Sequence, residues 1–321
     1  MVLLDVKNLK TYFTIGRGTV KAVDGISFDV ELGKAMGLAG ESGCGKTTTA
    51  LSILRILPSN GEIVGGRLLF KDKDLVTLDD DEMREGIRWK EISIVFQGAM
   101  NALNPVYSVG HQMVEAIKIH EPDVDEREAW ERSEKFMELV GLEPSRLSGF
   151  PHEFSGGMRQ RSMIAMALVC NPSLLIADEP TTALDVIVAA QVLKLLRELK
   201  TRLNLGMMLI THDLSIIAEI CEKVAIMYAG KIVEYGDIVT VFKEPLHPYT
   251  QGLMGAFPDI TAERTRMISI PGYPPDLLNP PKGCAFHERC KYAKDICQKE
   301  EPPPCELKKN HFVACYNVLR R

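Results

Sequence analysis

The sequence predicts an α/β protein, in which short apolar stretches of strand length alternate with stretches of helical periodicity. Residues 34–39 are predicted to form a strand that leads directly into a glycine-rich turn, and the residues after Lys46 are predicted to form a helix. Residues 174–177 and 207–210 are short and wholly apolar, as buried parallel strands usually are. These three observations indicate a largely parallel sheet with helices packed on it.

Two further stretches support this pattern. From Asp185 onward, apolar residues recur at steps of three and four, which predicts a helix with one apolar face. The members of this stripe are Val188, Val192, Leu195, Leu199 and Leu203. Residues 224–228 and 231–235, separated by Ala229-Gly230, are predicted to form a β-hairpin.

The stretch between Phe96 and Phe154 interrupts the alternation with helical patterns. A helix is expected over residues 126–140, capped by Asp123 or Asp125 and closed by Gly141. We therefore predict an inserted helical subdomain at about residues 98–160, within a first domain of residues 1–255. Prolines become frequent after Pro245, so residues 256–321 are predicted to be a linker followed by a cysteine-rich region.

Length, charge and hydropathy limit the kinds of partner. A chain of 321 residues fits one main domain with an appendage. A net charge of −5 gives no reason to expect a nucleic-acid partner, because proteins that bind the phosphate backbone carry a basic field. No apolar run reaches the length of a membrane-spanning helix, and Asp5, Lys7 and Lys10 interrupt any signal-peptide core. We expect the chain in the cytoplasm, unless partners hold it at a membrane.

Residues 40–47 read GESGCGKT and match the phosphate-loop pattern G-x-x-x-x-G-K-[ST] in full. Its glycines let backbone N–H groups converge on one point, toward which the following helix directs its positive end. Lys46 is expected to bridge the β- and γ-phosphates, and Thr47 to offer its hydroxyl to Mg²⁺. The residues predicted to hold the nucleotide here are Gly40, Ser42, Gly43, Cys44, Gly45, Lys46, Thr47 and Thr48.

Two carboxylates, Asp178 and Glu179, follow the apolar strand 174–177. Ligands of α/β proteins bind at the carboxyl ends of parallel strands, so these side chains belong near the phosphate loop. Asp178 is expected to hold Mg²⁺, directly or through water. Glu179 is the candidate base that orients and polarises the attacking water. The acidic run 79–82, in contrast, is predicted to be only the solvated start of a helix.

Residues 154–160 read FSGGMRQ, in which Ser155 is a plausible N-cap and Gly156-Gly157 opens a helix. Such a helix start is a second anion site. The stretch resembles the LSGGQ-type signature of ABC ATPases, with Phe for Leu and Met for Gln. Other residues match further motifs of that family. Gln97 resembles its Q-loop glutamine, Asp185 its D-loop aspartate and His212 its switch histidine. Phe13, with Tyr12 as the alternate, resembles its adenine-stacking aromatic.

The resemblance covers nearly all of residues 1–255. It implies an ABC ATPase core: a RecA-like mixed sheet with an antiparallel β subdomain and an inserted helical subdomain. It also implies a head-to-tail dimer in which ATP lies between one phosphate loop and the partner's signature, here Ser155, Gly156 and Gly157. The implied catalytic residues are Glu179, His212, Gln97 and Lys46, and the implied Mg²⁺ ligands are Thr47, Gln97 and Asp178.

Within the family, residues 179–186, 108–112 and 247–250 resemble the ATPase subunits of oligopeptide and dipeptide importers. Gly98-Ala99 departs from that branch, which usually has an acid and a proline after the glutamine. The implied partners are a second ABC ATPase subunit (a paralogue or a second copy), two transmembrane permease subunits and an extracellular substrate-binding protein. The chain would lie on the cytoplasmic face of the membrane. Peptides are the expected cargo, with oligosaccharides as the alternative.

Five cysteines crowd the last part of the chain at irregular spacing, which is unlike the closely spaced pairs of zinc sites. The same importer branch carries a [4Fe–4S] cluster there. The branch pattern matches Cys284, Cys290, Cys297 and Cys315, with Cys305 as the alternate fourth ligand. A zinc ion and unmetallated thiols remain the alternatives.

Two other functions compete with the importer ATPase. A non-transport ABC ATPase of DNA repair or translation usually shows a long coiled coil, CxxC zinc pairs or two cassettes, and this sequence has none of them. A regulatory module that binds ATP without hydrolysing it would typically have lost a catalytic group. Both Glu179 and His212 are present, which favours the ATPase.

Overall fold

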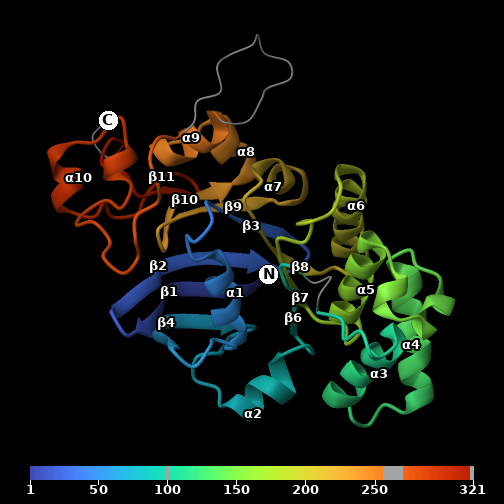
Figure 1. Ribbon diagram of the computed structural model, residues 1–321. Helices are drawn as coiled ribbons and strands as arrows, with labels where there is room; N and C mark the ends of the chain where they lie inside the picture. Colours follow the sequence, from blue (N-terminus) through green and yellow to red (C-terminus); the bar gives the residue numbers. More distant parts are fainter. Residues whose placement is uncertain (99–101, 256–269, 319–321) are drawn as a thin grey trace. The chain divides into compact units, whose positions relative to one another are not determined.

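The computed structural model describes residues 1–98, 102–255 and 270–318, and the chain divides into two compact units (Figure 1). Unit 1 comprises residues 1–3, 30–35 and 77–210, and unit 2 comprises residues 4–29, 36–76 and 211–321. The sequence-based division at residue 255 differs from this one, because the C-terminal region belongs to the same unit as the phosphate loop. Ala99 and the first part of the predicted linker, residues 256–269, lie outside the described residues.

Three parallel strands form the sheet of unit 1. They lie in the order β8 (Gly206–Thr211), β7 (Leu174–Asp178) and β6 (Ile92–Val95). Leu174 pairs with Ile92 on one side and with Gly206 on the other, so the carboxyl ends of β6 and β7 meet at one edge. Every residue of β7 is buried. The apolar stretches predicted to be buried strands are confirmed.

The helices of unit 1 begin at side-chain caps. They are α2 (Asp80–Glu82), which continues into a π-helical turn at Met83–Ile87, α3 (Val109–His120), α4 (Glu126–Leu139), α5 (Gly156–Leu168) and α6 (Val186–Arg202). Asp125, not Asp123, caps α4 by accepting the N–H of Glu128 at 2.8 Å. Asp79 and Glu82 form a capping box, which confirms the acidic run as a helix start.

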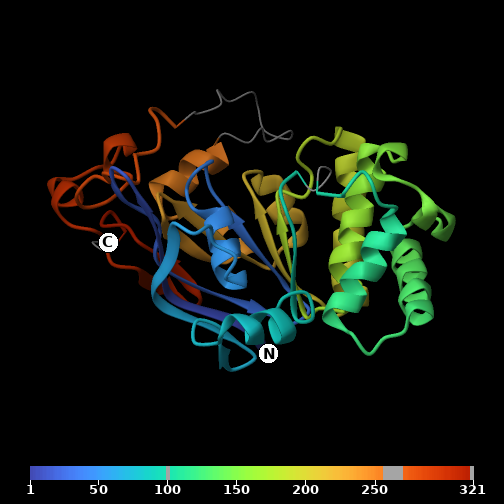
Figure 2. The ribbon, with the colours of Figure 1, turned by 60° about the horizontal axis from the view of Figure 1, so that its bottom comes forward.

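Helices α3, α4 and α5 pack on one another, with short 3₁₀ turns at Pro144–Ser148 and Pro151–Glu153 between α4 and α5 (Figure 1). Their contact is apolar: Met113, Phe136 and Ile164 are among the buried residues. The helices of residues 109–202 gather together in Figure 2 as well. The helical character predicted for this part of the chain is confirmed.

An antiparallel sheet forms one part of unit 2. Its strands lie in the order β2 (Gly18–Glu31), β1 (Val2–Ile15), β4 (Gly61–Phe70) and β5 (Lys73–Asp74). Helix α1 (Lys46–Leu54) lies against it (Figure 2). The hydroxyl oxygens of Ser52 and Thr11 are 2.8 Å apart in the buried contact between α1 and β1.

A second set of strands in unit 2 is mixed. Its order is β11 (Cys305–Lys308), β12 (His311–Val313), β10 (Lys231–Asp237), β9 (Lys223–Tyr228) and β3 (Ala35–Ala39). β3 and β9 are parallel, whereas β9 and β10 form the predicted antiparallel hairpin. β12 pairs with β10, so the C-terminal region extends this sheet, which the sequence did not predict.

The described residues of unit 2 also form the short helices α7 (Leu214–Ile220), α8 (Ile238–Lys243), α9 (Pro248–Gly255) and α10 (Asp295–Lys299). A 3₁₀ turn at His287–Arg289 precedes α10. Within the described residues, no helix has both the length and the apolar character that crossing a membrane requires.

Candidate functional site

The predicted phosphate loop connects β3 to α1 in unit 2, and its glycines are required by geometry. Gly40 has φ +155°, and a Cβ there would lie 2.1 Å from the carbonyl oxygen of Met227. Gly45 has φ +108°, and a Cβ there would lie 2.1 Å from the carbonyl oxygen of Ala22. Any side chain at either position would collide with rigid backbone. The loop therefore keeps a backbone-lined surface, as phosphate binding needs.

Lys46 is folded back onto this loop. Its ammonium donates to the carbonyl oxygens of Gly40 at 2.8 Å and Glu41 at 3.0 Å, and the residue is only 6% exposed. Both acceptors are neutral, so phosphate oxygens would compete well for the same charge. Cys44 lies next to the ammonium, and burial raises the pKa of its thiol. The Cys44 thiol is therefore buried and held in its neutral form.

The N-terminus of α1 differs from those of the other longer helices. Gly45 precedes α1 and provides no side-chain cap, whereas side chains cap α3, α4, α5 and α6. An N-terminus without a cap directs backbone N–H groups and the positive end of the helix dipole outward. Thr47 and Thr48 lie in this first turn. The start of α1 thus has the properties predicted for a phosphate site.

Gln97 and Glu179 of unit 1 are brought together, although they are far apart in sequence. The Glu179 carboxylate accepts hydrogen bonds from Gln97 Nε2 at 3.0 Å and from Thr182 Oγ1 at 2.9 Å. Glu179 also has φ +45°, a left-handed conformation that is unfavourable for a non-glycine residue. The preceding Asp178 ends β7 and is 1% exposed. This edge of the sheet therefore holds two carboxylates and an amide, which are oxygen ligands suited to Mg²⁺.

The signature-like helix start and the D-loop-like aspartate are both helix caps. Ser155 accepts the N–H of Met158 at 3.3 Å and caps α5, so Gly156 and Gly157 form its first turn, as predicted. Asp185 caps α6 by accepting the N–H groups of Ile187 and Val188 at 3.1 and 3.0 Å. The helix cap predicted at Ser155 is confirmed, whereas the cap at Asp185 was not predicted from the sequence.

The remaining predicted residues, His212, Phe13 and Tyr12, belong to unit 2. His212 is exposed and directly precedes Asp213, the N-cap of α7. Phe13 and Tyr12 are neighbours on β1. The Tyr12 hydroxyl donates to Asp24 at 2.7 Å, and burial raises its pKa to about 12.

Comparisons with known proteins agree with these features. A model of the ABC transporter family matches residues 23–182, and one described as the oligopeptide/dipeptide transporter C-terminal region matches residues 233–297. The oligopeptide transport ATP-binding protein OppD of Escherichia coli is 45% identical over 319 residues, covering 99% of this chain and 94% of the relative. The dipeptide transport ATP-binding protein DppD of Bacillus subtilis is 45% identical over 317 residues, covering 98% and 94%.

The chain belongs to the family of oligopeptide/dipeptide ABC transporter ATP-binding proteins. A solved dimeric structure of the ATP-binding cassette MJ0796, in a post-hydrolysis state bound to ADP and Pi, matches with a TM-score of 0.65 at 25% identity. The match covers 73% of this chain and 98% of that one. The predicted ABC ATPase fold is confirmed, and the chain is an ATP-hydrolysing transporter subunit.

The sequence did not identify the surroundings of Glu41, the second residue of the ATPase's phosphate loop. Arg289 donates to both oxygens of its carboxylate, at 2.6 and 2.9 Å. The hydroxyl of Tyr249 accepts its backbone N–H at 2.9 Å. Both residues lie in stretches that the sequence had singled out, since Arg289 directly precedes Cys290 and Tyr249 lies in the importer-like stretch 247–250. Neither motif, however, indicates a contact with the phosphate loop.

The C-terminal cysteines of the ATPase are unpaired thiols. Burial raises the pKa of Cys284 to about 12 and also raises the pKa of Cys290 and Cys315. Electrostatic interactions with one another and with Cys297 contribute to these shifts, so the four thiols are neighbours; Cys305 contributes to none of them. Among the described residues, no group of three or more His, Cys, Asp or Glu is arranged to hold a metal ion.

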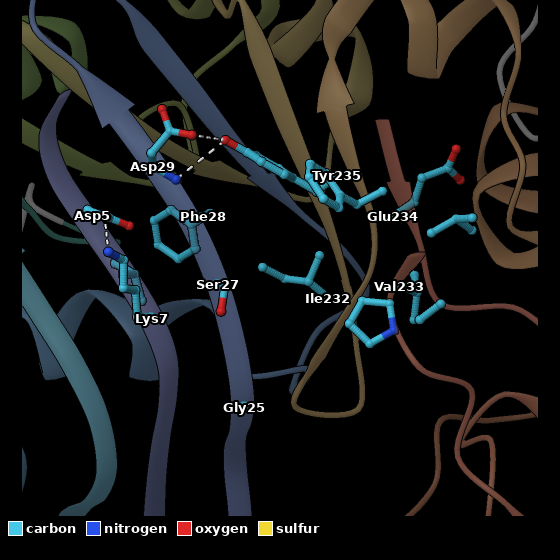
Figure 3. Close-up of a pocket in the computed structure, with 15 residues that line it drawn as sticks. Asp5, Lys7, Gly25, Ser27, Phe28, Asp29, Ile232, Val233, Glu234 and Tyr235 are labelled. Carbon is cyan, nitrogen blue, oxygen red and sulfur yellow. Dashed lines mark hydrogen bonds and ion pairs between the residues drawn. The ribbon is translucent and has the colours of Figure 1, made fainter. Parts of the chain in front are cut away.

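A cavity of about 450 Å³ in unit 2 is separate from the predicted site residues (Figure 3). It is lined by β1, β2, β10 and β12, including Phe28 and Ile232. At one end the Tyr235 hydroxyl donates to the Asp29 carboxylate at 2.7 Å (Figure 3). None of the residues predicted to bind nucleotide lines it. The cavity is therefore not part of the predicted nucleotide site of the ATPase.

Proposed function

We propose that this chain binds Mg-ATP on residues 40–47 and hydrolyses it with Glu179 as the base, to drive the import of oligopeptides or dipeptides. The observation that carries the catalytic assignment is the hydrogen bond of 3.0 Å from Gln97 to Glu179. It brings the proposed water-activating carboxylate next to a neutral amide that orients it. The positive φ of Glu179 supports the same role, because strained backbone is concentrated at functional sites.

The chain's own groups divide the work. Lys46 leaves the carbonyl oxygens of Gly40 and Glu41 and binds the β- and γ-phosphates. Glu179 accepts a proton from the attacking water, and Gln97 keeps the carboxylate in position. His212 serves the same nucleotide site, as the family motif implies. Phe13, or alternatively Tyr12, stacks on the adenine.

Magnesium fits the oxygen donors of the chain. Asp178 offers a buried carboxylate, Thr47 a hydroxyl and Gln97 an amide oxygen, and hard cations prefer such ligands. When bound, the ion supplies positive charge that stabilises the phosphate oxygens during hydrolysis. Each of the three residues holds it directly or through water.

The active form is a head-to-tail pair of ATPase subunits. In each, Ser155, Gly156 and Gly157 bind the γ-phosphate held by the other subunit's phosphate loop. The open backbone of the first turn of α5 suits this role, and the solved structure of MJ0796 is a dimer that holds ADP and Pi. The second subunit is a paralogue or another copy of this chain. The pair works on the cytoplasmic face of the membrane with two permease subunits and an extracellular binding protein.

The named cargo of the relatives supports peptides over oligosaccharides. The test is ATP hydrolysis by the assembled transporter in vesicles, with its binding protein and with either a peptide mixture or an oligosaccharide mixture. We expect peptides to stimulate phosphate release and oligosaccharides to leave it at the basal rate. Stimulation by oligosaccharides alone would contradict the peptide assignment.

A [4Fe–4S] cluster on Cys284, Cys290, Cys297 and Cys315 completes the proposal. The mutual electrostatic influence of these four thiols supports it. The raised pKa values mean that the thiols need a cationic group before they ionise. A cluster of four irons spaces its ligands more widely than one ion does, so it is compatible with thiols that do not form a single-ion site. The division into a nucleotide-binding domain of residues 1–255 and a linker with a cysteine-rich region at residues 256–321 stays a prediction.

Metal analysis tests the cluster. Chain purified without oxygen is expected to contain iron and sulfide in equal amounts. Cys297→Ser is expected to lose them, and Cys305→Ser, the matched control, to keep them. One zinc per chain, or loss of iron in Cys305→Ser, would overturn this assignment.

A further inference from the structure

Glu41 is fixed at each of its polar groups. Its backbone N–H donates to the Tyr249 hydroxyl at 2.9 Å, and its carbonyl oxygen accepts from Lys46 at 3.0 Å. Its carboxylate forms a two-pronged ion pair with Arg289, with N–O distances of 2.6 and 2.9 Å. From inside the phosphate loop, Lys46 and the Cys44 backbone N–H, at 3.3 Å, donate to the Glu41 carbonyl oxygen. The contacts of the Glu41 N–H and carboxylate come from the C-terminal part of unit 2.

Arg289 is itself held rigidly. Its side chain is 6% exposed, and its Nε donates to the carbonyl oxygen of Pro271 at 2.8 Å. Its Nη1 also donates to the Tyr228 hydroxyl at 3.3 Å, and the guanidinium lies over the Tyr228 and Phe286 rings. The ion pair with Glu41 is the largest cause of the raised pKa of Arg289. A planar guanidinium that uses its donors in fixed directions is a stiff connector.

The aromatic residues around this ion pair are also packed together. The rings of Tyr228 and Tyr249 have centroids 4.7 Å apart, and Phe286 lies 5.2 Å from Tyr228 and 5.4 Å from Tyr249. Tyr228 ends β9, Tyr249 lies in α9, and Phe286 immediately precedes the 3₁₀ turn that carries Arg289. Three segments of unit 2 therefore support one residue of the phosphate loop.

This support matters when Lys46 moves. In the structure Lys46 bonds to the carbonyl oxygens of Gly40 and Glu41, and it must give these up to reach a phosphate. A loop that relied on Lys46 for its shape would relax at that moment. A loop whose Glu41 is fixed from outside keeps its shape. The fraction of loops ready to bind then stays high, and the apparent affinity is not reduced by rearrangement.

We propose that Arg289 is a positioning residue of the phosphate loop, which sets the affinity for ATP by holding Glu41 in place. The inference rests on the proposed function, in which this loop binds ATP. Arg289 does not reach the nucleotide itself. It acts through Glu41, and it connects the cysteine-rich region to the ATP site.

The experiment measures equilibrium ATP binding and single-turnover hydrolysis of bound ATP in the full chain. Arg289→Met keeps the apolar stem but removes the charge, and its ATP Kd is expected to rise about tenfold, as losing one charge-assisted contact allows. Glu41→Gln removes the charge of the partner carboxylate, and its ATP Kd is expected to rise by about the same factor. Arg289→Lys, which keeps the charge but not the two-pronged geometry, is expected to fall between Arg289→Met and the wild type.

Two readouts separate positioning from general damage. The hydrolysis rate of bound ATP is expected to change less than twofold, so the effect lies in Kd. In the double variant, Arg289→Met is expected to add less than twofold to the effect of Glu41→Gln, because both act through one contact. Effects that multiply in the double variant would overturn the proposal.

Two control variants match the changes. Arg132→Met breaks another arginine–carboxylate pair, in unit 1, in which Arg132 Nη1 donates to both oxygens of Glu121 at 2.8 and 2.7 Å. Glu301→Gln breaks a different tie of the C-terminal region, the ion pair of 2.7 Å with Lys231. Both are expected to leave the ATP Kd within twofold of the wild type. If Glu301→Gln weakens binding as much as Arg289→Met does, loosening of the region rather than Arg289 is responsible, and the proposal is wrong.

The outcomes also separate this inference from the proposed function. A wild-type chain that does not bind ATP refutes the proposed function itself. A wild-type chain that binds ATP, with Arg289→Met and Glu41→Gln of equal affinity, refutes only the positioning role. If Arg289→Met does not fold, Glu41→Gln and Arg289→Lys decide in the same way.

Discussion

Two glutamates of the proposed ATP site, Glu179 in unit 1 and Glu41 in unit 2, are held in opposite ways. The Glu179 carboxylate accepts hydrogen bonds from two neutral donors, Gln97 and Thr182, and its backbone is left-handed. Glu41 is paired with the buried guanidinium of Arg289. A carboxylate that must take up a proton is better held by neutral groups, because a fixed cation stabilises its ionised form. A carboxylate that only shapes a loop gains from the cation.

Under the proposed function, this comparison implies different tasks for the two units: unit 1 would supply the group that activates water, and unit 2 would supply a rigid surface for the phosphates. Variants in unit 2 should therefore act first on ATP binding, and variants around Glu179 on the rate of hydrolysis. The predictions below test this division, beginning with the largest effect.

Lys46→Ala should weaken ATP binding most, by about a hundredfold, because the charge-assisted contacts of the ammonium with two phosphates are lost. Calorimetric titration of the full chain measures the effect. Lys194→Ala, an exposed lysine of α6, is the control and should bind as the wild type does. An unchanged affinity for ATP in Lys46→Ala would contradict the assignment of ATP binding to unit 2.

Acid should destabilise the chain through His247. Burial lowers the pKa of His247 to about 4, and its Nδ1 accepts the N–H of Tyr249 at 3.0 Å, which requires an unprotonated Nδ1. The unfolded chain, with a histidine pKa of 6.5, binds more protons at pH 4–6.5 than the folded chain does. Stability from this group is therefore complete above pH 6.5 and is lost as pH falls toward 4. Between pH 7 and pH 5 we expect a loss of about 2 kcal/mol.

Urea unfolding at the two pH values measures the loss. His247→Asn keeps an acceptor near the position of Nδ1 but does not titrate, so its stability should change much less with pH. Equal losses in the wild type and in His247→Asn would show that another group is responsible.

Gln97→Ala should slow ATP hydrolysis up to about tenfold, because Glu179 loses the hydrogen bond from the neutral amide of Gln97. The affinity for ATP should change little. Steady-state phosphate release by the assembled transporter gives the rate, and Gln191→Ala, an exposed glutamine of α6, is the control. A weaker affinity for ATP with an unchanged rate of hydrolysis would contradict the proposed division of tasks between the two units.

Two helix caps should give the smallest effects. Asp185→Ala and Asp125→Ala each remove a capping side chain, so each should lower the free energy of unfolding by about 1 kcal/mol. Only Asp185→Ala should also slow hydrolysis, because Asp185 resembles the D-loop aspartate of the family and is predicted to belong to the nucleotide site. Urea unfolding and phosphate release on both variants test this, and equal activity in the two would leave Asp185 as a cap only.

The elements that could be predicted are those with local causes. The glycine pattern of residues 40–47, the apolar run before Asp178 and the cap at Asp125 act within one turn or strand, so periodicity and spacing show them. Two features could not be predicted in this way. Arg289 and Glu41 are 248 positions apart, and β12 joins β10 from the far end of the chain. Such contacts depend on how complete elements pack, which local pattern does not record.

The contact of Gln97 with Glu179 could be predicted only in part from the sequence. The two residues are 82 positions apart, and only the family motifs indicated that both serve one site. The carboxyl ends of β6 and β7 meet at one sheet edge, which explains physically why the motifs converge.

The most direct test of the account is Glu179→Gln, measured for ATP affinity and phosphate release in the same preparation. We expect an affinity within threefold of the wild type and phosphate release slowed about hundredfold or more, the usual contribution of a general base. Glu198→Gln, an exposed glutamate of α6, should match the wild type in both. Release within tenfold of the wild type, or an affinity that falls together with the rate, would contradict the account.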